Sequence, residues 1–201
     1  MILNEAWKDP DWGVFILLSM TTGARRGEVC GVRWPHLDLD ASVVRLHRSI
    51  AQIAGDVWEK DTKTHQQRRV TLDPEITDIL RAHRTRCEQR ASDLGTRIRR
   101  DGFVFSPAPD CSIQIKPNTM TQRYGRLAAR LGIDTHLNCL RHYSATELIA
   151  AGVDIRTVAG RLGHSGGGST TLRAYTAFQL EAEQRASSAL AARRPRPPRS
   201  A

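Results

Sequence analysis

The chain has 201 residues, enough for one domain with a full hydrophobic core. Its formal net charge is +9, and arginine dominates its basic residues, 26 against 4 lysines; such a surface suits phosphate partners, although it also fits charges that are merely solvated. The sequence shows no long apolar run, no signal-peptide pattern and no closely paired cysteines, which argues against a membrane span, secretion, a zinc site and a disulfide framework, and fits a reducing cytoplasm.

The N-terminal third predicts two helices and a small sheet. Residues 12–20 are almost wholly apolar and predict a buried helix, with Gly23 as its C-terminal stop. A second short helix is expected from about residue 25 to residue 32. Three runs rich in β-forming residues then predict one small three-stranded antiparallel sheet: 42–53, 57–64 and 69–72.

The rest of the chain is predicted to be mainly helical. Boundary residues, chiefly aspartate or proline before a segment and glycine after it, predict five further helices: 74–94, 119–131, 140–151, a short one from Asp154 to before Gly163, and 178–192. Residues 193–201, RRPRPPRSA, predict a disordered basic tail. The expected fold class is α+β, mainly α, in one domain over residues 1–192.

Two short charged stretches are candidates for function. In TGARRGE, residues 22–28, Arg25 and Glu28 directly follow an apolar helix and a glycine, a position that holds a charge rigidly beside the core. The alternative is an exposed turn with an ion pair. In DTKTHQQRRV, residues 61–70, Lys63 stands beside the tip of a turn, and the alternative there is a solvated hairpin.

The C-terminal half adds an arginine, a histidine and a tyrosine. Arg141 stands at the start of a predicted helix, where the helix N-terminus favours a phosphate. His164 follows Gly163, a place where histidine is usually a surface or capping residue. Tyr175 lies in STTLRAYTAF after a glycine-rich loop, and a tyrosine there is more often packed than reactive.

Taken together and in this order, these stretches resemble the tyrosine recombinases of the phage-integrase type, over about residues 12–175. The resemblance implies the catalytic-domain fold of that family, a helical bundle with the small antiparallel sheet. It makes Glu28 the buried structural partner of the first arginine. It assigns the catalytic positions in chain order: Arg25, Lys63, Asn138, Arg141, His164 and Tyr175.

The implied chemistry is the cutting and rejoining of double-stranded DNA. Arg25 and Arg141 would clamp the non-bridging oxygens of a phosphodiester, whose negative charge grows during attack on phosphorus. Tyr175 would attack and form a 3′-phosphotyrosyl link. Lys63 would protonate the leaving 5′ oxygen and His164 would donate a hydrogen bond to the phosphate. Because this link stores the bond energy, no cofactor and no metal are expected.

The sequence departs from the family in two ways. The family usually has histidine where this chain has Asn138, and asparagine can donate a hydrogen bond but cannot exchange a proton near neutral pH. His136 is close by but at a different offset. In addition, the N-terminal core-binding and arm-binding domains of the family are expected to be absent, which predicts weak and strongly salt-dependent binding of DNA.

Several readings stay open at this point. The leading interpretation is a site-specific recombinase or integrase of a mobile element that acts on the nucleoid in the cytoplasm. The family resemblance implies that it acts as a homotetramer on DNA. The first alternative is a catalytically impaired, truncated integrase remnant that only binds DNA. A type IB topoisomerase would use similar residues without pairing two sites, and a structural helical protein would have no role on nucleic acid. No membrane partner is expected.

Overall fold

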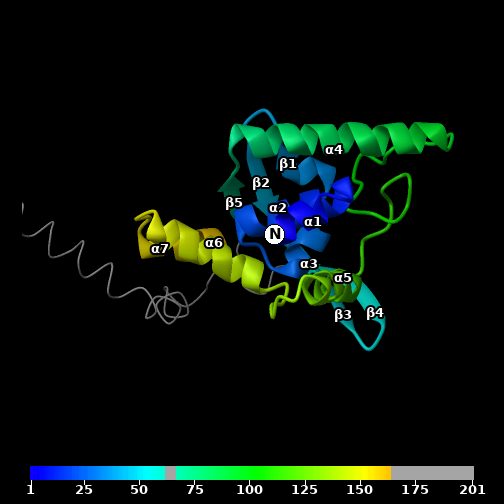
Figure 1. The fold of residues 1–201 in the computed structure, drawn as a ribbon. Coiled ribbons are helices and arrows are strands. Elements are labelled where there is room, and N and C mark those ends of the chain that lie inside the picture. Colours follow the sequence, from blue (N-terminus) through cyan, green and yellow to red (C-terminus); the bar gives the residue numbers. More distant parts are fainter. Residues whose placement is uncertain (62–66, 164–201) are drawn as a thin grey trace, which may run out of the picture.

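The computed structural model describes residues 1–61 and 67–163 (Figure 1). The helix predicted at 178–192 and the tail predicted at 193–201 lie outside the described residues. The described part is mixed helix and strand, which confirms the α+β, mainly α fold class. Its α-helices are, in chain order, α1 (Ile2–Ala6), α2 (Pro10–Thr22), α3 (Arg26–Cys30), α4 (Pro74–Asp93), α5 (Pro117–Arg130), α6 (Cys139–Ala150) and α7 (Ile155–Leu162), with a 3₁₀ turn η1 (Trp34–His36).

Local boundary residues set the ends of these helices, and Gly23 and Asp73 do so as predicted. Asp9 accepts hydrogen bonds from the backbone N–H groups of Asp11 and Trp12 and so caps α2. Gly23 ends α2 in the left-handed region, with a φ of 60°. Asp73 likewise caps α4 through the backbone N–H of Ile76. The segment α1 is a helix that the sequence pattern did not predict.

The strands form two sheets where the sequence predicted one. The three-stranded sheet has the antiparallel order β1 (Leu37–Asp38), β2 (Val43–Leu46), β5 (Arg68–Thr71), and a separate antiparallel hairpin joins β3 (Arg48–Ile53) to β4 (Asp56–Asp61). The predicted run 42–53 is therefore divided at His47. Its first half pairs with β5 and its second half pairs with β4.

The reason for this division lies in Arg48. Val44 and Leu46 face the core at alternate positions of β2, and continued alternation would bury position 48. Arg48 is exposed instead and forms an ion pair of 2.9 Å with Asp61 on β4. The chain leaves the first sheet at this point, and the hairpin projects beside α5, on the far side of the domain from α4 (Figure 1).

The helix α2 occupies the centre of the domain and contacts α1, α3, α4 and α6. Its Phe15 ring stacks with Trp12 and meets Phe105 edge-on inside the main apolar core. By contrast, α6 and α7 share a small separate cluster made of Ala145, Ile149, Val158 and Leu162. The C-terminal end of α7 therefore has few main-core contacts of its own, and polar side chains tie it to α2 and β5, as described next.

Candidate active site

Arg25 and Glu28 form the first part of the site, at the start of α3. The Glu28 carboxylate accepts a hydrogen bond from the backbone N–H of Arg25 at 2.7 Å and another from its Nη1 at 3.1 Å. The Arg25 Nη2 donates to the backbone oxygen of Gly163 at 3.2 Å. The Glu28 side chain is 1% exposed and that of Arg25 is 35% exposed, so the arginine alone of the two reaches solvent.

Arg68 on β5 completes the surroundings of this carboxylate, and sequence reasoning missed it. Its Nη1 and Nη2 donate to the two oxygens of Glu28 at 3.1 and 2.6 Å, a paired geometry that suits guanidinium and carboxylate. Burial alone would raise the pKa of Glu28. The hydrogen bonds and the charge of Arg68, helped by Arg25, outweigh burial and hold that pKa below its usual value. Glu28 is therefore an ionised, buried group.

Arg141 brings a third guanidinium to the same place from the first turn of α6. Its Nη1 donates to the backbone oxygen of Gly23 at 2.6 Å. Its Nη2 is buried and has no hydrogen-bond partner among residues 1–61 and 67–163. Burial, followed by repulsion from Arg25, lowers the pKa of Arg141 to about 10. The group stays protonated at neutral pH, and its surroundings favour the approach of an anion.

Gly23 makes this arrangement possible. Its φ of 60° lies in the left-handed region, and a Cβ there would come within 2.4 Å of Leu162 Cδ2 and 3.1 Å of Ser144 Oγ. A side chain at this position would therefore push α6 and α7 away from the end of α2. The glycine keeps its carbonyl within reach of Arg141 and lets the second arginine approach the first.

In the described part of the chain, the side chain of Asn138 makes no hydrogen bond to Arg25, Arg68 or Arg141. Asn138 is exposed, immediately precedes α6, and makes no side-chain capping bond to that helix. Its backbone oxygen accepts from the N–H of Arg141 at 3.0 Å. His136, the nearby histidine, is exposed and its Nδ1 lies 2.8 Å from Cys139 Sγ. His136 therefore contacts Cys139, and the expected role of position 138 stays a prediction.

Three of the predicted site residues lie outside the described residues: Lys63, His164 and Tyr175. The described chain reaches both sides of the Lys63 segment, because β4 ends at Asp61 and β5 begins at Arg68. It also reaches Gly163, which accepts the hydrogen bond of Arg25 and immediately precedes His164 in sequence.

The cluster carries surplus positive charge. Among the described residues, Arg25 and Arg68 bond to one carboxylate, Glu28, whose charge also acts on Arg141, so the three arginines leave two positive charges without a counter-charge in this cluster. A phosphodiester carries one negative charge, and a second develops when a nucleophile attacks phosphorus. Guanidinium donors fixed beforehand around such a group stabilise that change without reorganising.

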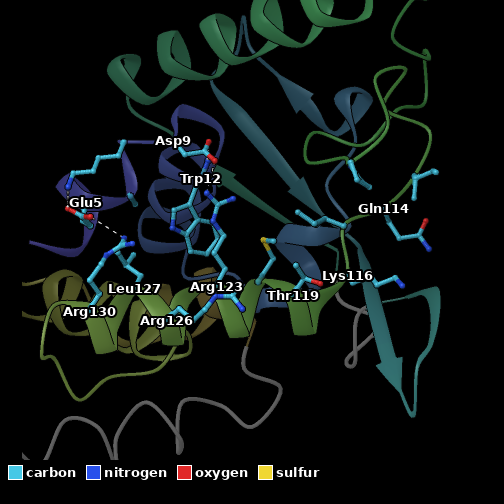
Figure 2. A pocket seen from close by; sticks show the side chains of 16 residues that line it. Glu5, Asp9, Trp12, Gln114, Lys116, Thr119, Arg123, Arg126, Leu127 and Arg130 are labelled. Carbon is cyan, nitrogen blue, oxygen red and sulfur yellow. Dashed lines mark hydrogen bonds and ion pairs between the residues drawn. The ribbon is translucent and has the colours of Figure 1, made fainter. Parts of the chain in front are cut away.

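Other parts of the described chain differ from this cluster. A cavity of about 780 Å³ lies between α1, α2, α5 and the segment 107–117 (Figure 2). There Arg130 pairs with Glu5 and Arg123 pairs with Asp9, so these arginines have carboxylate partners inside the protein. In the described ranges we find no group of three or more potential ligands that could hold a metal ion. No helix of those ranges is long and apolar enough to cross a membrane.

A sequence model described as the phage integrase family matches residues 10–181, most of the chain. The chain belongs to the phage integrase family. Among curated relatives of this family, it is 28% identical to a "Tyrosine recombinase XerC-like" protein of Caldanaerobacter subterraneus subsp. tengcongensis, over 81% of this chain and 45% of that protein. It is 25% identical to the ICEBs1 integrase of Bacillus subtilis, over 80% of this chain and 43% of the relative. The chain thus spans about half the length of the curated relatives it matches.

Solved structures of integrase-family proteins share the fold. The Tn1549 transposon integrase in complex with transposon right end DNA aligns with a TM-score of 0.71 at 18% identity, covering 92% of this chain and 63% of that one. The XerA recombinase crystal structure aligns with a TM-score of 0.66 at 22% identity, covering 98% and 62%. At such identities the likeness concerns the fold, and it confirms the expected catalytic-domain architecture.

Proposed function

We propose that residues 1–192 of this chain are the catalytic domain of a site-specific DNA recombinase that cuts and rejoins double-stranded DNA through a 3′-phosphotyrosyl intermediate. The observation that carries the proposal is the meeting of Arg25 and Arg141 beside a buried, ionised Glu28, with the Arg141 Nη2 left unpartnered among the described residues. Membership of the integrase family supports the same conclusion.

In this proposal the two arginines bind the non-bridging oxygens of the scissile phosphate. The Tyr175 oxygen attacks phosphorus as its proton passes to water, the bond from phosphorus to the 5′ oxygen breaks, and Lys63 gives that oxygen a proton. His164 donates a hydrogen bond to the phosphate. A 5′-hydroxyl then attacks the phosphotyrosyl link in the reverse sense, which rejoins the strand and frees Tyr175.

Asn138 is proposed to slow this reaction without abolishing it. An amide can donate a hydrogen bond to a phosphate oxygen, but it cannot exchange a proton near neutral pH. We expect Asn138→His to raise the cleavage rate while leaving the fold unchanged, since the side chain is exposed and caps nothing. Unchanged cleavage in this variant would show that the histidine role does not belong to position 138.

The proposed partner is double-stranded DNA, on which the protein is proposed to act as a homotetramer. The proposed place of action is the nucleoid in the cytoplasm. Residues 193–201 are proposed to form a basic tail. Several solved structures with a similar fold are integrases or recombinases in complex with DNA, which supports the choice of partner. The alternative of a remnant that only binds DNA is not favoured, because the family match and the curated relatives are those of recombinases and integrases.

A nicked suicide DNA substrate tests the proposal, using DNA from the junctions that flank the gene because the target site is unknown. The wild type and Tyr175→Phe are compared on a denaturing gel. We expect a covalent protein–DNA band from the wild type and none from the variant. A folded wild type that binds this DNA but forms no band would contradict the proposal, and an equal band from Tyr175→Phe would move the nucleophile elsewhere.

A further inference from the structure

We infer that Arg68 is a positioning residue for the phosphate-binding arginines: it neutralises Glu28 and holds the end of α7, so that Arg25 is free to bind phosphate. This inference rests on the proposed function. The family resemblance assigns no role to Arg68.

The first step is the division of labour around Glu28. Arg68 donates to both carboxylate oxygens, at 3.1 and 2.6 Å, and its side chain is 8% exposed. Arg25 gives the same carboxylate one side-chain bond, at 3.1 Å, and remains 35% exposed. Arg68 is therefore the interior partner of Glu28, whereas Arg25 has a second guanidinium edge and an open side.

The second step is electrostatic. A buried carboxylate that loses its counter-charge is strongly unfavourable. Without Arg68, Arg25 would become the closest counter-charge of Glu28, and moving toward a phosphate would leave the carboxylate unpaired. With Arg68 present, Arg25 can share its charge with a phosphate at little cost to Glu28. Arg68 also preserves the two surplus positive charges of the cluster. These charges stabilise the extra negative charge that develops on the phosphate in the transition state.

The third step is mechanical. Arg68 Nε donates to the backbone oxygen of Arg161 at 2.9 Å, and Arg161 Nη2 in turn donates to the backbone oxygens of Thr21 and Thr71. A Cβ at Gly163 would meet Arg68 Nη1 at 2.7 Å, so the guanidinium packs directly on that glycine. Arg68 thus fixes the last turn of α7 against α2 and β5.

The two effects meet at Gly163, whose backbone oxygen accepts from Arg25. The buried guanidinium of Arg68 sets both the charge that Arg25 feels and the position of the carbonyl that Arg25 contacts. A buried ion pair is by itself weak evidence for a stabilising role. What distinguishes Arg68 is that its partner is shared with an exposed arginine at the site.

The test measures single-turnover cleavage of the suicide substrate at saturating DNA, and DNA affinity separately by fluorescence anisotropy. Arg69→Gln is the matched control, because Arg69 is the exposed neighbour on the same strand and the variant removes the same charge. For Arg68→Gln we expect cleavage to slow by about 10- to 100-fold. Its DNA affinity should fall no further than that of Arg69→Gln.

A second variant separates positioning from folding. In Glu28→Gln/Arg68→Gln the neutral glutamine no longer holds Arg25 as a counter-charge, so we expect cleavage to recover at least part of the loss seen in Arg68→Gln. Arg68→Lys keeps the charge without the paired geometry, and we expect an intermediate rate. If circular dichroism shows that Arg68→Gln is unfolded, the cleavage rates of these two variants are compared with that of the wild type instead.

If the wild type forms its adduct, either of two results would overturn the inference alone. The first is that folded Arg68→Gln cleaves at the rate of Arg69→Gln. The second is that the folded double variant cleaves no faster than folded Arg68→Gln. If the single variant is unfolded, the overturning result is Arg68→Lys cleaving at the wild-type rate. A folded, DNA-bound wild type that forms no adduct would overturn the proposed function and this inference together. The two failures are therefore distinguishable from one gel series.

Discussion

The two ends of α2 carry similar groups to different effect. At its N-terminal end, the Asp11 carboxylate bonds to His83 Nδ1 at 3.1 Å and Arg90 Nη1 at 2.8 Å, with Arg86 Nε at 3.6 Å. Beyond the C-terminal end of α2 and Gly23, the Glu28 carboxylate lies among Arg25, Arg68 and Arg141. Each of these two carboxylates, Asp11 and Glu28, lies beside at least two arginines.

The difference lies in burial. The side chains of Arg86 and Arg90 near Asp11 are 39% and 47% exposed, so water screens most of their charge, although Arg86 Nε is buried without a hydrogen-bond partner among the described residues. At the other end Arg68 is 8% exposed, and burial is the main cause of the lowered pKa of Arg141. We interpret surplus positive charge that is buried from water as a binding site for an anion. Positive charge that is exposed to water is part of the solvated surface.

The largest expected effect is on chemistry at the Glu28 end. We expect Arg141→Ala to slow single-turnover cleavage by about 10²- to 10³-fold, because a fixed donor to the phosphate is lost. The fold should persist, since the side chain makes one backbone hydrogen bond in the described structure. The measurement is the rate of adduct formation on the suicide substrate. A rate within threefold of wild type would remove Arg141 from the site.

The Asp11 end should respond in stability and leave chemistry unchanged. His83 is 1% exposed, lies against the rings of Trp34 and Phe105, and bonds to Val104 O at 2.9 Å. We expect His83→Ala to lower the free energy of unfolding by about 2–4 kcal/mol in a urea titration. Its cleavage rate per folded molecule should match the wild type. The exposed His142→Ala is the control, and an equal loss in both would contradict the comparison.

The difference between the two ends was only partly visible in the sequence. Helix ends were predictable because they depend on local residues such as Asp73 and Gly23. The buried pairing of Glu28 with Arg68 was not, because 40 residues separate them and the contact exists only once α3 packs near β5. One signal was present: Arg68 and Val70 lie on the same face of a strand, so an inward arginine required a buried carboxylate partner.

Sheet pairing was the other limit. The run 42–53 has β-forming residues throughout, and nothing local in it shows that the chain changes partner at His47. The catalytic assignments came from motif order. Of these, Arg25 and Arg141 are brought together in the structure, whereas Lys63, His164 and Tyr175 lie outside the described residues and stay predictions.

Gly23 and Gly132 together isolate the effect of close packing at the C-terminal end of α2. Gly23 and Gly132 have almost the same φ, 60° and 66°, but a Cβ at Gly132 meets nothing within 4 Å. We expect Gly132→Ala to cost about 1 kcal/mol from backbone strain alone. Gly23→Ala should cost about 1–2 kcal/mol more, because its Cβ would collide with Leu162. Chemical denaturation of both variants measures this, and equal losses would show that the close approach at Gly23 carries no cost.

The dependence of stability on acid tests the two carboxylates, Asp11 and Glu28, directly. The pKa of Asp11 is lowered, mainly by its hydrogen bond to His83, and the pKa of Glu28 is lowered although burial opposes the change. A carboxylate with a lowered folded-state pKa stabilises the fold above its ordinary pKa and loses that contribution as pH falls. Ordinary values here are 3.8 and 4.5.

Unfolding free energy should therefore be level above about pH 5 and decline toward pH 3. Asp11→Asn should flatten the decline, as should Glu28→Gln where that variant folds. The measurement is a series of urea titrations across this range. A wild type whose stability rises on acidification would show that neither carboxylate is held ionised as described.

The central claim is that Arg25 and Arg141 act on the negative charge of the scissile phosphate. The most direct test replaces that phosphate by an uncharged methylphosphonate, at the cleavage position mapped with the suicide substrate, and compares wild type with Arg141→Ala. The account predicts that the difference in rate shrinks from about 10²- to 10³-fold to less than about tenfold, because no charge remains to be stabilised. An undiminished difference on the neutral substrate would contradict it.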